Sequence, residues 1–196
     1  MGKVSNLSRL ARGTYGSGGE VLDKTLYDDC ILAAAVLVHR LFVVPLGGGV
    51  PAKTLADTNM TTAGMIPQGQ NIAVRAIKVW YAGLHQFASA DVLAFYAMLA
   101  NTTVEILLPG KDKLGEWNLQ ELFGCCVTQA ATPAVAGNNE PHLSPRFHGI
   151  TPLNTPLVLA ALTPIEVRIQ HHVATAAGIA GDRLYVGLTG TMQRAS

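Results

Sequence analysis

The six histidines of this 196-residue chain are the side chains most able to bind a metal ion or move a proton near neutral pH. His171 and His172 form the only close pair among them. Neighbouring residues of a strand point to opposite faces, so these two imidazoles cannot bind one ion together. His142 and His148 lie in a loop-like interval without a Cys or Glu-x-x-His partner at metal-ligand spacing. The pattern favours structural or surface roles for the histidines, and no metal or other cofactor is predicted.

Nucleophilic and acidic side chains lack the neighbours that would activate them. No Gly-x-Ser-x-Gly motif supports a serine nucleophile, and Cys125 and Cys126 have no basic residues beside them. Glu116 and Glu121 stand five residues apart near a predicted helix end, which favours solvent exposure over an acid–base pair. The glycine triplet at residues 47–49 lacks the Lys-Ser/Thr pair of a phosphate-binding loop and indicates a turn. The sequence therefore predicts a protein that is not an enzyme and takes no small-molecule substrate.

Three cysteines, Cys30, Cys125 and Cys126, do not make a disulfide framework. Their number is odd, and two adjacent cysteines have a poor geometry for bridging each other. We expect reduced and mostly buried thiols, which is typical of folding in a cytoplasm.

The apolar stretch at residues 30–46 is the segment most similar to a membrane span. His39 and Arg40 interrupt it, and it is shorter than the roughly 20 apolar residues that a spanning helix needs. A strand or core segment is favoured. Residues 1–14 are polar and basic, and no apolar segment of a signal peptide follows them directly.

The elements that would position these side chains are mostly strands. In residues 165–171, Ile165, Val167, Ile169 and His171 fall on one face and polar residues on the other, which is the alternation of a half-buried strand.

Residues 183–189 alternate again, with Leu184, Val186 and Leu188 in phase. Because a connection rich in Ala and Gly joins this segment to the preceding strand, we predict that the two strands pair antiparallel.

Three further strands are predicted. Residues 41–44 have strong β preference and end at Pro45. Residues 71–81 form the longest candidate, and their apolar phase shifts between Val74 and Ile77, which indicates a bulge or burial on both faces. Residues 103–108 also alternate.

Two short helices and two long loops complete the pattern. Residues 89–99 have Ser89 as a possible cap and an apolar face, and residues 117–123 could form a shorter helix ended by glycine. Residues 53–70 and 128–151 read as loops, and the second is long enough to suggest a functional or partner-bound segment.

Together these elements predict a mainly β fold, a single jelly-roll barrel or sandwich of antiparallel strands with one or two short helices and long loops. The domain is expected at residues 31–196, after an N-terminal arm at residues 1–30. The strand residues expected in its core are Phe42, Val74, Trp80, Ile106, Val167, Ile169, Leu184, Val186 and Leu188.

The arm carries Lys3, Arg9 and Arg12, followed by several glycines. One interpretation is a frayed terminus. The other is a basic arm that becomes ordered against a neighbouring subunit, a nucleic acid or a membrane surface.

The composition indicates a covered surface. Charged residues make up 14% of the chain, whereas about 25% is usual in a soluble domain. A monomer needs charged surface to stay soluble, so the shortage suggests that partners cover much of this protein. The formal net charge of +1 provides no overall attraction to nucleic acid or acidic membranes.

Two parts of the sequence resemble a known class of proteins. The first is the segment Leu41-Phe42-Val43-Val44-Pro45-Leu46 with its glycines, then Lys53, Asp57-Thr58-Asn59-Met60, Gly64 and Ile66-Pro67 before a long strand. The second is the ending Leu184-Tyr185-Val186-Gly187-Leu188-Thr189-Gly190 with Arg194. These parts, the two ends of residues 40–194, are similar to the jelly-roll major coat proteins of tailless icosahedral bacteriophages.

The resemblance implies a structural viral capsid protein that self-assembles into capsomers of an icosahedral shell. Its partners would be other copies of itself and other capsid proteins, with the basic arm as an expected contact to the genome or to an internal lipid membrane. It would be made in the host cytoplasm and reside in the virion. The length of 196 residues suits a single barrel and excludes a double one.

Two alternatives stay open at this point. One is a virion spike or lectin-like jelly-roll module that binds a sugar or a receptor. The other is a small-molecule enzyme on the same barrel, a cupin, whose Gly-x(5)-His-x-His cluster is missing from the sequence.

Overall fold

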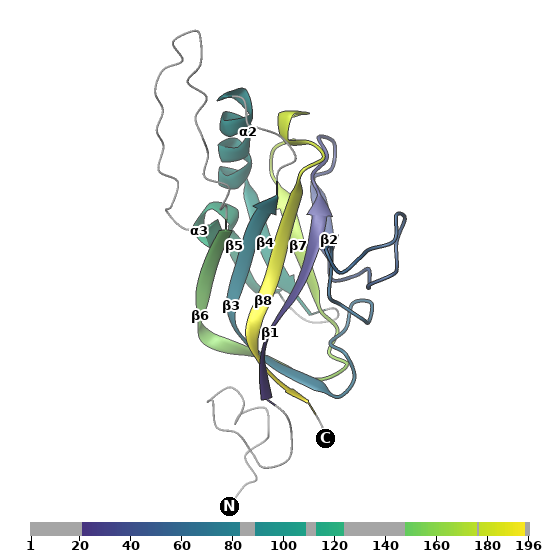
Figure 1. The fold of residues 1–196 in the computed structure, drawn as a ribbon. Helices are drawn as coiled ribbons and strands as arrows, with labels where there is room; N and C mark the ends of the chain where they lie inside the picture. The colour runs from purple at the N-terminus through teal and green to yellow at the C-terminus, as the bar shows by residue number, and fades with distance from the viewer. Residues whose placement is uncertain (1–20, 83–88, 109–112, 124–147, 176, 195–196) are drawn as a thin grey trace, which may run out of the picture.

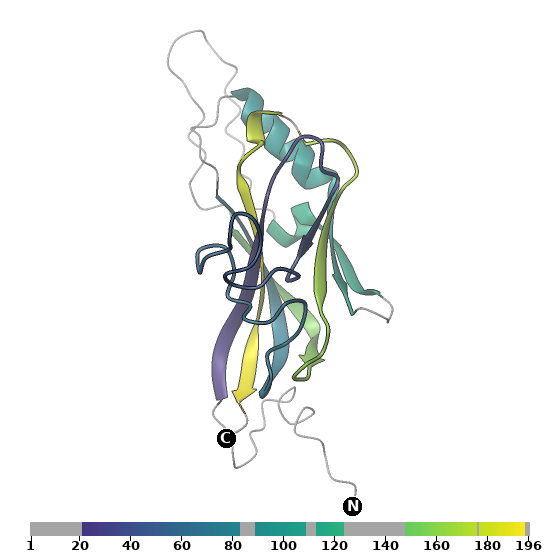
Figure 2. The ribbon, with the colours of Figure 1, turned by 90° about the vertical axis from the view of Figure 1, so that its right-hand side faces the viewer.

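A computed structural model describes residues 21–82, 89–108, 113–123, 148–175 and 177–194, and its core is two facing four-stranded antiparallel sheets (Figures 1 and 2). The first sheet has the order β1-β8-β3-β6, and the second has the order β2-β7-β4-β5. The strands of the first sheet are β1 (Val21–Ile31), β8 (Arg183–Arg194), β3 (Gln70–Ala82) and β6 (His148–Leu159). Those of the second are β2 (Val38–Leu41), β7 (Glu166–His171), β4 (Thr102–Leu107) and β5 (Lys113–Asn118).

The chain alternates between the two sheets. Among the described strands, each one is followed by a strand of the opposite sheet, except that β5 follows β4 in the same sheet. Apart from β4 and β5, strands that are hydrogen-bonded neighbours are therefore far apart in the sequence. Thr25 of β1, for example, lies opposite Thr189 of β8, and their hydroxyl oxygens are 2.9 Å apart.

The core lies between the sheets, where the central strands of each sheet turn an apolar face inward. Val167 and Ile169 of β7 and Leu184, Val186 and Leu188 of β8 are all completely buried.

Helices cover one end of the core, and Figure 2 shows α2 (Ser89–Ala100) lying across that end. Phe95 of α2 is buried against Tyr81 of β3, with ring centroids 4.6 Å apart. It also meets Phe123 of the short helix α3 (Leu119–Phe123) at 6.0 Å. A 3-10 turn, η1 (Ala177–Ile179), precedes β8. No helix in the described ranges is long and apolar enough to cross a bilayer.

Several predicted elements are confirmed. β3 has its register shift between Val74 and Ala76, where the sequence indicated a bulge. α2 begins at Ser89 as predicted, and the glycine triplet forms a turn in which Gly47 and Gly49 have φ of +79° and +87°. Such values favour glycine, which lacks a Cβ.

The predicted pairing of the two C-terminal strands is wrong. β7 pairs with β2 and β4, whereas β8 pairs with β1 and β3 in the other sheet. The connection at residues 172–182 crosses from one sheet to the other. Alternation identifies a strand's buried face, but it carries no information about which strand lies beside it.

Part of the expected arm is a strand. Residues 21–30 were expected to belong to it, but they lie in β1, which pairs with β8 from Val21↔Gln193 to Ile31↔Arg183. Polar residues at inward positions hid this strand, since Asp28 is fully buried there. Lys3, Arg9 and Arg12 lie outside the described residues.

Three aromatic residues differ from expectation. Phe42 is fully buried but follows β2 rather than lying in a strand, with φ of 68°. Trp80 lies in β3 but is only partly buried, on the outer face opposite its inward neighbours Val79 and Tyr81. Trp117, expected in a helix, belongs to β5.

Most of the predicted loop at residues 128–151 lies outside the described residues, and its last part, from His148, begins β6. Cys125, Cys126 and His142 also lie outside them. Cys30 is a free, half-buried cysteine, and burial raises the pKa of its thiol.

Candidate functional site

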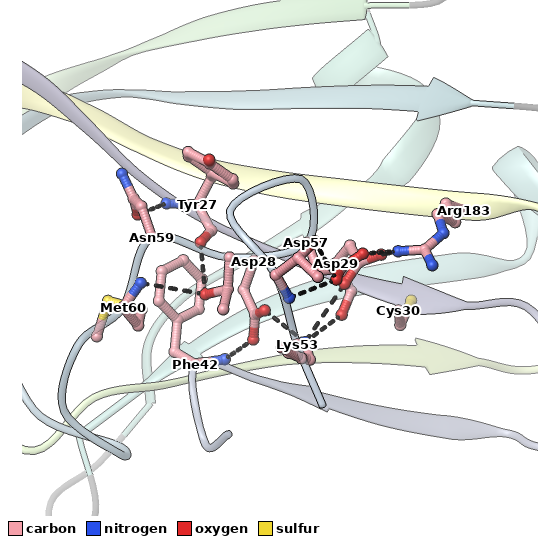
Figure 3. A network of polar contacts seen from close by, with 12 residues as sticks. Tyr27, Asp28, Asp29, Cys30, Phe42, Lys53, Asp57, Asn59, Met60 and Arg183 are labelled. Atoms are coloured by element: carbon pink, nitrogen blue, oxygen red, sulfur yellow. Dashed lines mark hydrogen bonds and ion pairs between the residues drawn. The ribbon is translucent and has the colours of Figure 1, made fainter. Parts of the chain in front are cut away.

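The most highly connected polar cluster of the described chain joins β1 to the loop after β2 (Figure 3). Its centre is the fully buried carboxylate of Asp28. Lys53 Nζ donates to Asp28 Oδ1 at 2.5 Å, and the backbone amide of Phe42 donates to Asp28 Oδ2 at 2.5 Å. One side chain of β1 thereby fixes both the turn after β2 and the loop that follows it.

Two further carboxylates, those of Asp29 and Asp57, extend the cluster to β8. Arg183 Nη1 donates to Asp29 Oδ2 at 2.6 Å and also pairs with Asp57. Asp57 Oδ2 accepts from the amide and the hydroxyl of Thr54 at 2.7 and 2.8 Å. The Thr54 amide, the Thr54 hydroxyl and Arg183 hold the pKa of Asp57 below its ordinary value.

The electrostatics of Asp28 are different. Burial raises the pKa of Asp28, and the hydrogen bonds from Lys53 and Phe42 oppose that rise. Three carboxylates, Asp28, Asp29 and Asp57, thus share two cations, Lys53 and Arg183. The carboxylates are already engaged with protein groups, so this cluster acts as a clamp that positions the loop.

The same loop covers the outer edge of β1. Asn59 Nδ2 donates to Thr25 O at 2.7 Å, and its Oδ1 accepts from Tyr27 N at 2.9 Å. Thr58 Oγ1 donates to Tyr27 O at 3.0 Å. These side chains satisfy backbone groups that an edge strand would otherwise expose to pairing with another chain.

A row of alternating charges crosses the outer face of the second sheet. Arg40 of β2 makes two hydrogen bonds to Glu166 of β7, of 2.9 and 2.6 Å, and Arg168 Nη2 also donates to Glu166 at 3.2 Å. Arg168 lies 3.9 Å from Glu105 of β4, which accepts from Lys113 at 2.6 Å. The row links all four strands of this sheet.

The outer face of the first sheet is aromatic instead. The rings of Trp80 and Tyr185 are stacked with centroids 4.8 Å apart, and the ring of Tyr27 packs edge-on against Trp80 with centroids 6.0 Å apart. The ammonium of Lys78 lies 5.3 Å from the centroid of the Trp80 ring. Gly187 makes room for this group, because a Cβ there would approach Trp80 Cζ3 to 3.2 Å and Thr25 Cγ2 to 2.8 Å.

The core residues expected from the sequence lie between the sheets with the exception of Trp80. Those that are fully buried are Phe42, Val74, Ile106, Val167, Ile169, Leu184, Val186 and Leu188. Glu116 and Glu121 are exposed, and His171 and His172 point to opposite faces, the first buried and the second exposed.

Sequence reasoning missed Asp28, Asp29 and Arg183 as members of a cluster. Adjacent acids in a strand gave no sign that one of them is buried, and their partners Lys53 and Asp57 come from a loop. Lys53 and Asp57 were noted as residues of a predicted loop and in the coat-protein resemblance, but not as partners of buried acids.

Among the described residues, no three His, Cys, Asp or Glu side chains gather where they could hold a metal ion. What the described clusters do chemically is to hold strands and loops in place. The chain matches no protein-family model, no curated protein and no solved structure.

Proposed function

We propose that this protein is a structural capsid subunit, a jelly-roll coat protein that assembles with copies of itself into an icosahedral shell. The observation that carries the proposal is the strand order. Eight antiparallel strands divide as β1-β8-β3-β6 and β2-β7-β4-β5, and the chain changes sheet at each step other than that from β4 to β5. Two Greek keys wound into two four-stranded sheets give this order, and coat proteins commonly use that architecture.

The fold alone does not select a function, because lectins and cupins use the same barrel. Surface composition favours assembly. Around the β2–β7 edge, Val36, Leu37, Val38 and Val173 are all exposed, with Val38 paired to Gln170 and Leu37 O accepting from His171 N. We name these four residues the apolar edge. Together with a charged content of 14%, the apolar edge is suited to burial against a second copy of the chain.

Rigidity also supports a structural role. The Asp28 clamp fixes the loop after β2, and the charge row links the four strands of the second sheet. A shell requires subunits that present the same surface in every copy. Interlocked ion pairs of partly buried groups contribute more to that uniqueness than isolated surface pairs do.

The basic residues Lys3, Arg9 and Arg12 would serve as an assembly arm that contacts neighbouring subunits, other capsid proteins, the genome or an internal membrane. The alternative function is a virion spike or lectin-like module. The aromatic group of Tyr27, Trp80 and Tyr185 favours it, because aromatic side chains are frequent at recognition surfaces.

Size-exclusion chromatography with light scattering, followed by negative-stain imaging, tests the proposal. Shells, rings or large capsomers of the purified chain are the expected result. A discrete trimer that binds glycans would favour the module. A protein that stays monomeric under every assembly condition tried would overturn the coat function.

A further inference from the structure

Two imidazole rings pack against each other on the inner face of the second sheet, near one of its ends. His39 of β2 and His171 of β7 have ring centroids 5.3 Å apart, with their planes at 84°. His171 is 2% exposed, and His39 is partly buried. The strands bring them together because His39 lies opposite Ile169, two residues before His171. Both side chains therefore occupy the same inward face as Ile169.

These rings have too few hydrogen-bond partners for a charged state. His171 Nδ1 lies 2.8 Å from Thr102 Oγ1 of β4. Within the described ranges, the Nε2 atoms of both His39 and His171 are buried without a hydrogen-bond partner. A neutral imidazole tolerates one unpartnered nitrogen, but protonation would add a buried N–H donor and a positive charge.

The described charges nearby do not compensate for that charge. Arg40, Glu166, Arg168 and Glu105 pair with one another on the opposite face of the same strands.

The remaining described groups near this end are also unsuited to pairing with an imidazolium. His172 is exposed on the other face, with Nε2 3.2 Å from Thr103 Oγ1. Asp182, before β8, is bonded to the Tyr81 hydroxyl. The described side chains of α2, from Ala94 to Ala100, include Tyr96 and no charged group. Burial, together with smaller contributions from His39 and His172, lowers the pKa of His171 to about 4, and burial also lowers the pKa of His39.

β2 is the element that such a charge would displace. It has four residues, and β7 is its one neighbour in the sheet order. The backbone bond from His171 N to Leu37 O, of 2.7 Å, and the Arg40–Glu166 pair add to that attachment. A short edge strand opens at a smaller free-energy cost than the central strands of a sheet.

We propose that His39 and His171 form an acid-sensitive latch, which holds β2 against β7 while both rings are neutral and releases β2 when either ring is protonated. The released strand would carry with it Val36, Leu37 and Val38, so acid would remodel that edge of the molecule. This inference goes beyond the coat function and stands without it, because it rests on the burial and pairing of the two rings alone.

Hydrogen exchange of the β2 amides, compared with those of central β3, tests the latch in the full-length protein. After correction for intrinsic exchange, the opening constant of β2 should rise on the order of 30-fold between pH 7.5 and pH 5, since a released histidine titrates near 6.5. Glu166, which pairs with Arg40 of β2, has a pKa below its ordinary value and stays mostly charged down to pH 5. In the double variant His39→Gln with His171→Gln, this rise should disappear. The matched control His172→Gln changes an exposed histidine one residue away and should retain it.

An NMR titration of the wild-type imidazoles keeps the latch falsifiable if the double variant does not fold. A midpoint for His171 near 4 supports the latch. A midpoint near 6.5 overturns it, as does a double variant whose β2 opens with the wild-type pH dependence. Neither result depends on whether the protein assembles.

Discussion

The ammonium of Lys53 lies 2.5 Å from Oδ1 of Asp28, and this contact binds a loop to a strand that precedes it by about 25 residues. The carboxylate of Asp28 is 1% exposed, whereas the Lys53 side chain is 20% exposed. The lysine therefore covers a buried charge from the solvent side.

Removing the cation should expose the cost of burying Asp28. Lys53→Met should lower the free energy of unfolding by roughly 3 kcal/mol at pH 7, because it leaves a buried carboxylate with too few partners. The loss should shrink on acidification, since Asp28, whose pKa is already raised, then takes up a proton and becomes neutral. Urea unfolding at several pH values measures both effects.

Lys113→Met is the matched control for that experiment. Lys113 pairs with Glu105 and Glu116, but its own side chain is 41% exposed. Without it, Glu116 is left to solvent and Glu105 keeps Arg168 at 3.9 Å. The unfolding midpoint should change little. Equal losses in the two variants would show that the Asp28 clamp has no special role.

The charge row predicts a separate acid response. Arg40 and Arg168 hold the pKa of Glu166 below its ordinary value of 4.5. Because the folded pKa is the lower one, this contribution is complete above pH 4.5 and is lost as pH falls toward the folded pKa.

Glu166→Gln should therefore flatten the dependence of stability on pH below 4.5 and leave the region from 6.5 to 4.5 unchanged. Thermal unfolding across the full range reports both regions. A variant that flattens only the upper region would contradict the assignment.

The inward phase of β7 can be tested with two adjacent residues. Ile169 is completely buried, so Ile169→Asp should cost roughly 4 kcal/mol or more and prevent soluble folding. Arg168 lies on the outer face at 37% side-chain exposure, and Arg168→Gln should be far better tolerated. Soluble expression and melting temperature compare them, and similar values for both would contradict the phase.

Deletion of residues 1–19 separates the fold from assembly. β1 begins at Val21, so the truncated chain keeps all eight described strands and should retain its circular dichroism spectrum. If the basic arm joins subunits, particle formation measured by light scattering should fall several-fold. Assembly as fast and complete as that of the full chain would show that the arm is a frayed end.

Features of the fold that depend on a few neighbouring residues could be predicted from the sequence, whereas features that depend on distant residues could not. The bulge in β3, the start of α2 at Ser89 and the buried face of β7 follow from periodicity and capping within a few residues. The partners of β7 and β8 do not, because the choice of sheet depends on residues that lie between 59 and 172 positions away.

The candidate sites were non-local in the same way. His171 was recognised as inward, but its neighbour His39 lies 132 positions earlier on a strand that shows no regular alternation. Asp28 was placed in the expected arm, because the cation that allows its burial, Lys53, comes from a loop 25 residues later and is not visible in the local pattern. Phe42 has strong β preference, yet the Asp28 carboxylate that binds its amide holds it in a turn.

The position of β8 between β1 and β3 has a consequence for how the protein is made. β1 cannot pair within its sheet until β8 has been synthesised, because the partner of Thr25 is Thr189, 164 residues later. Until β8 leaves the ribosome, β1 and β3 are strands without their shared neighbour, and such long-range pairing is slow. A nascent chain would expose both edges throughout synthesis. We therefore expect a chain that stops before Arg183 to show no stable β signal in circular dichroism and to require a chaperone to stay in solution.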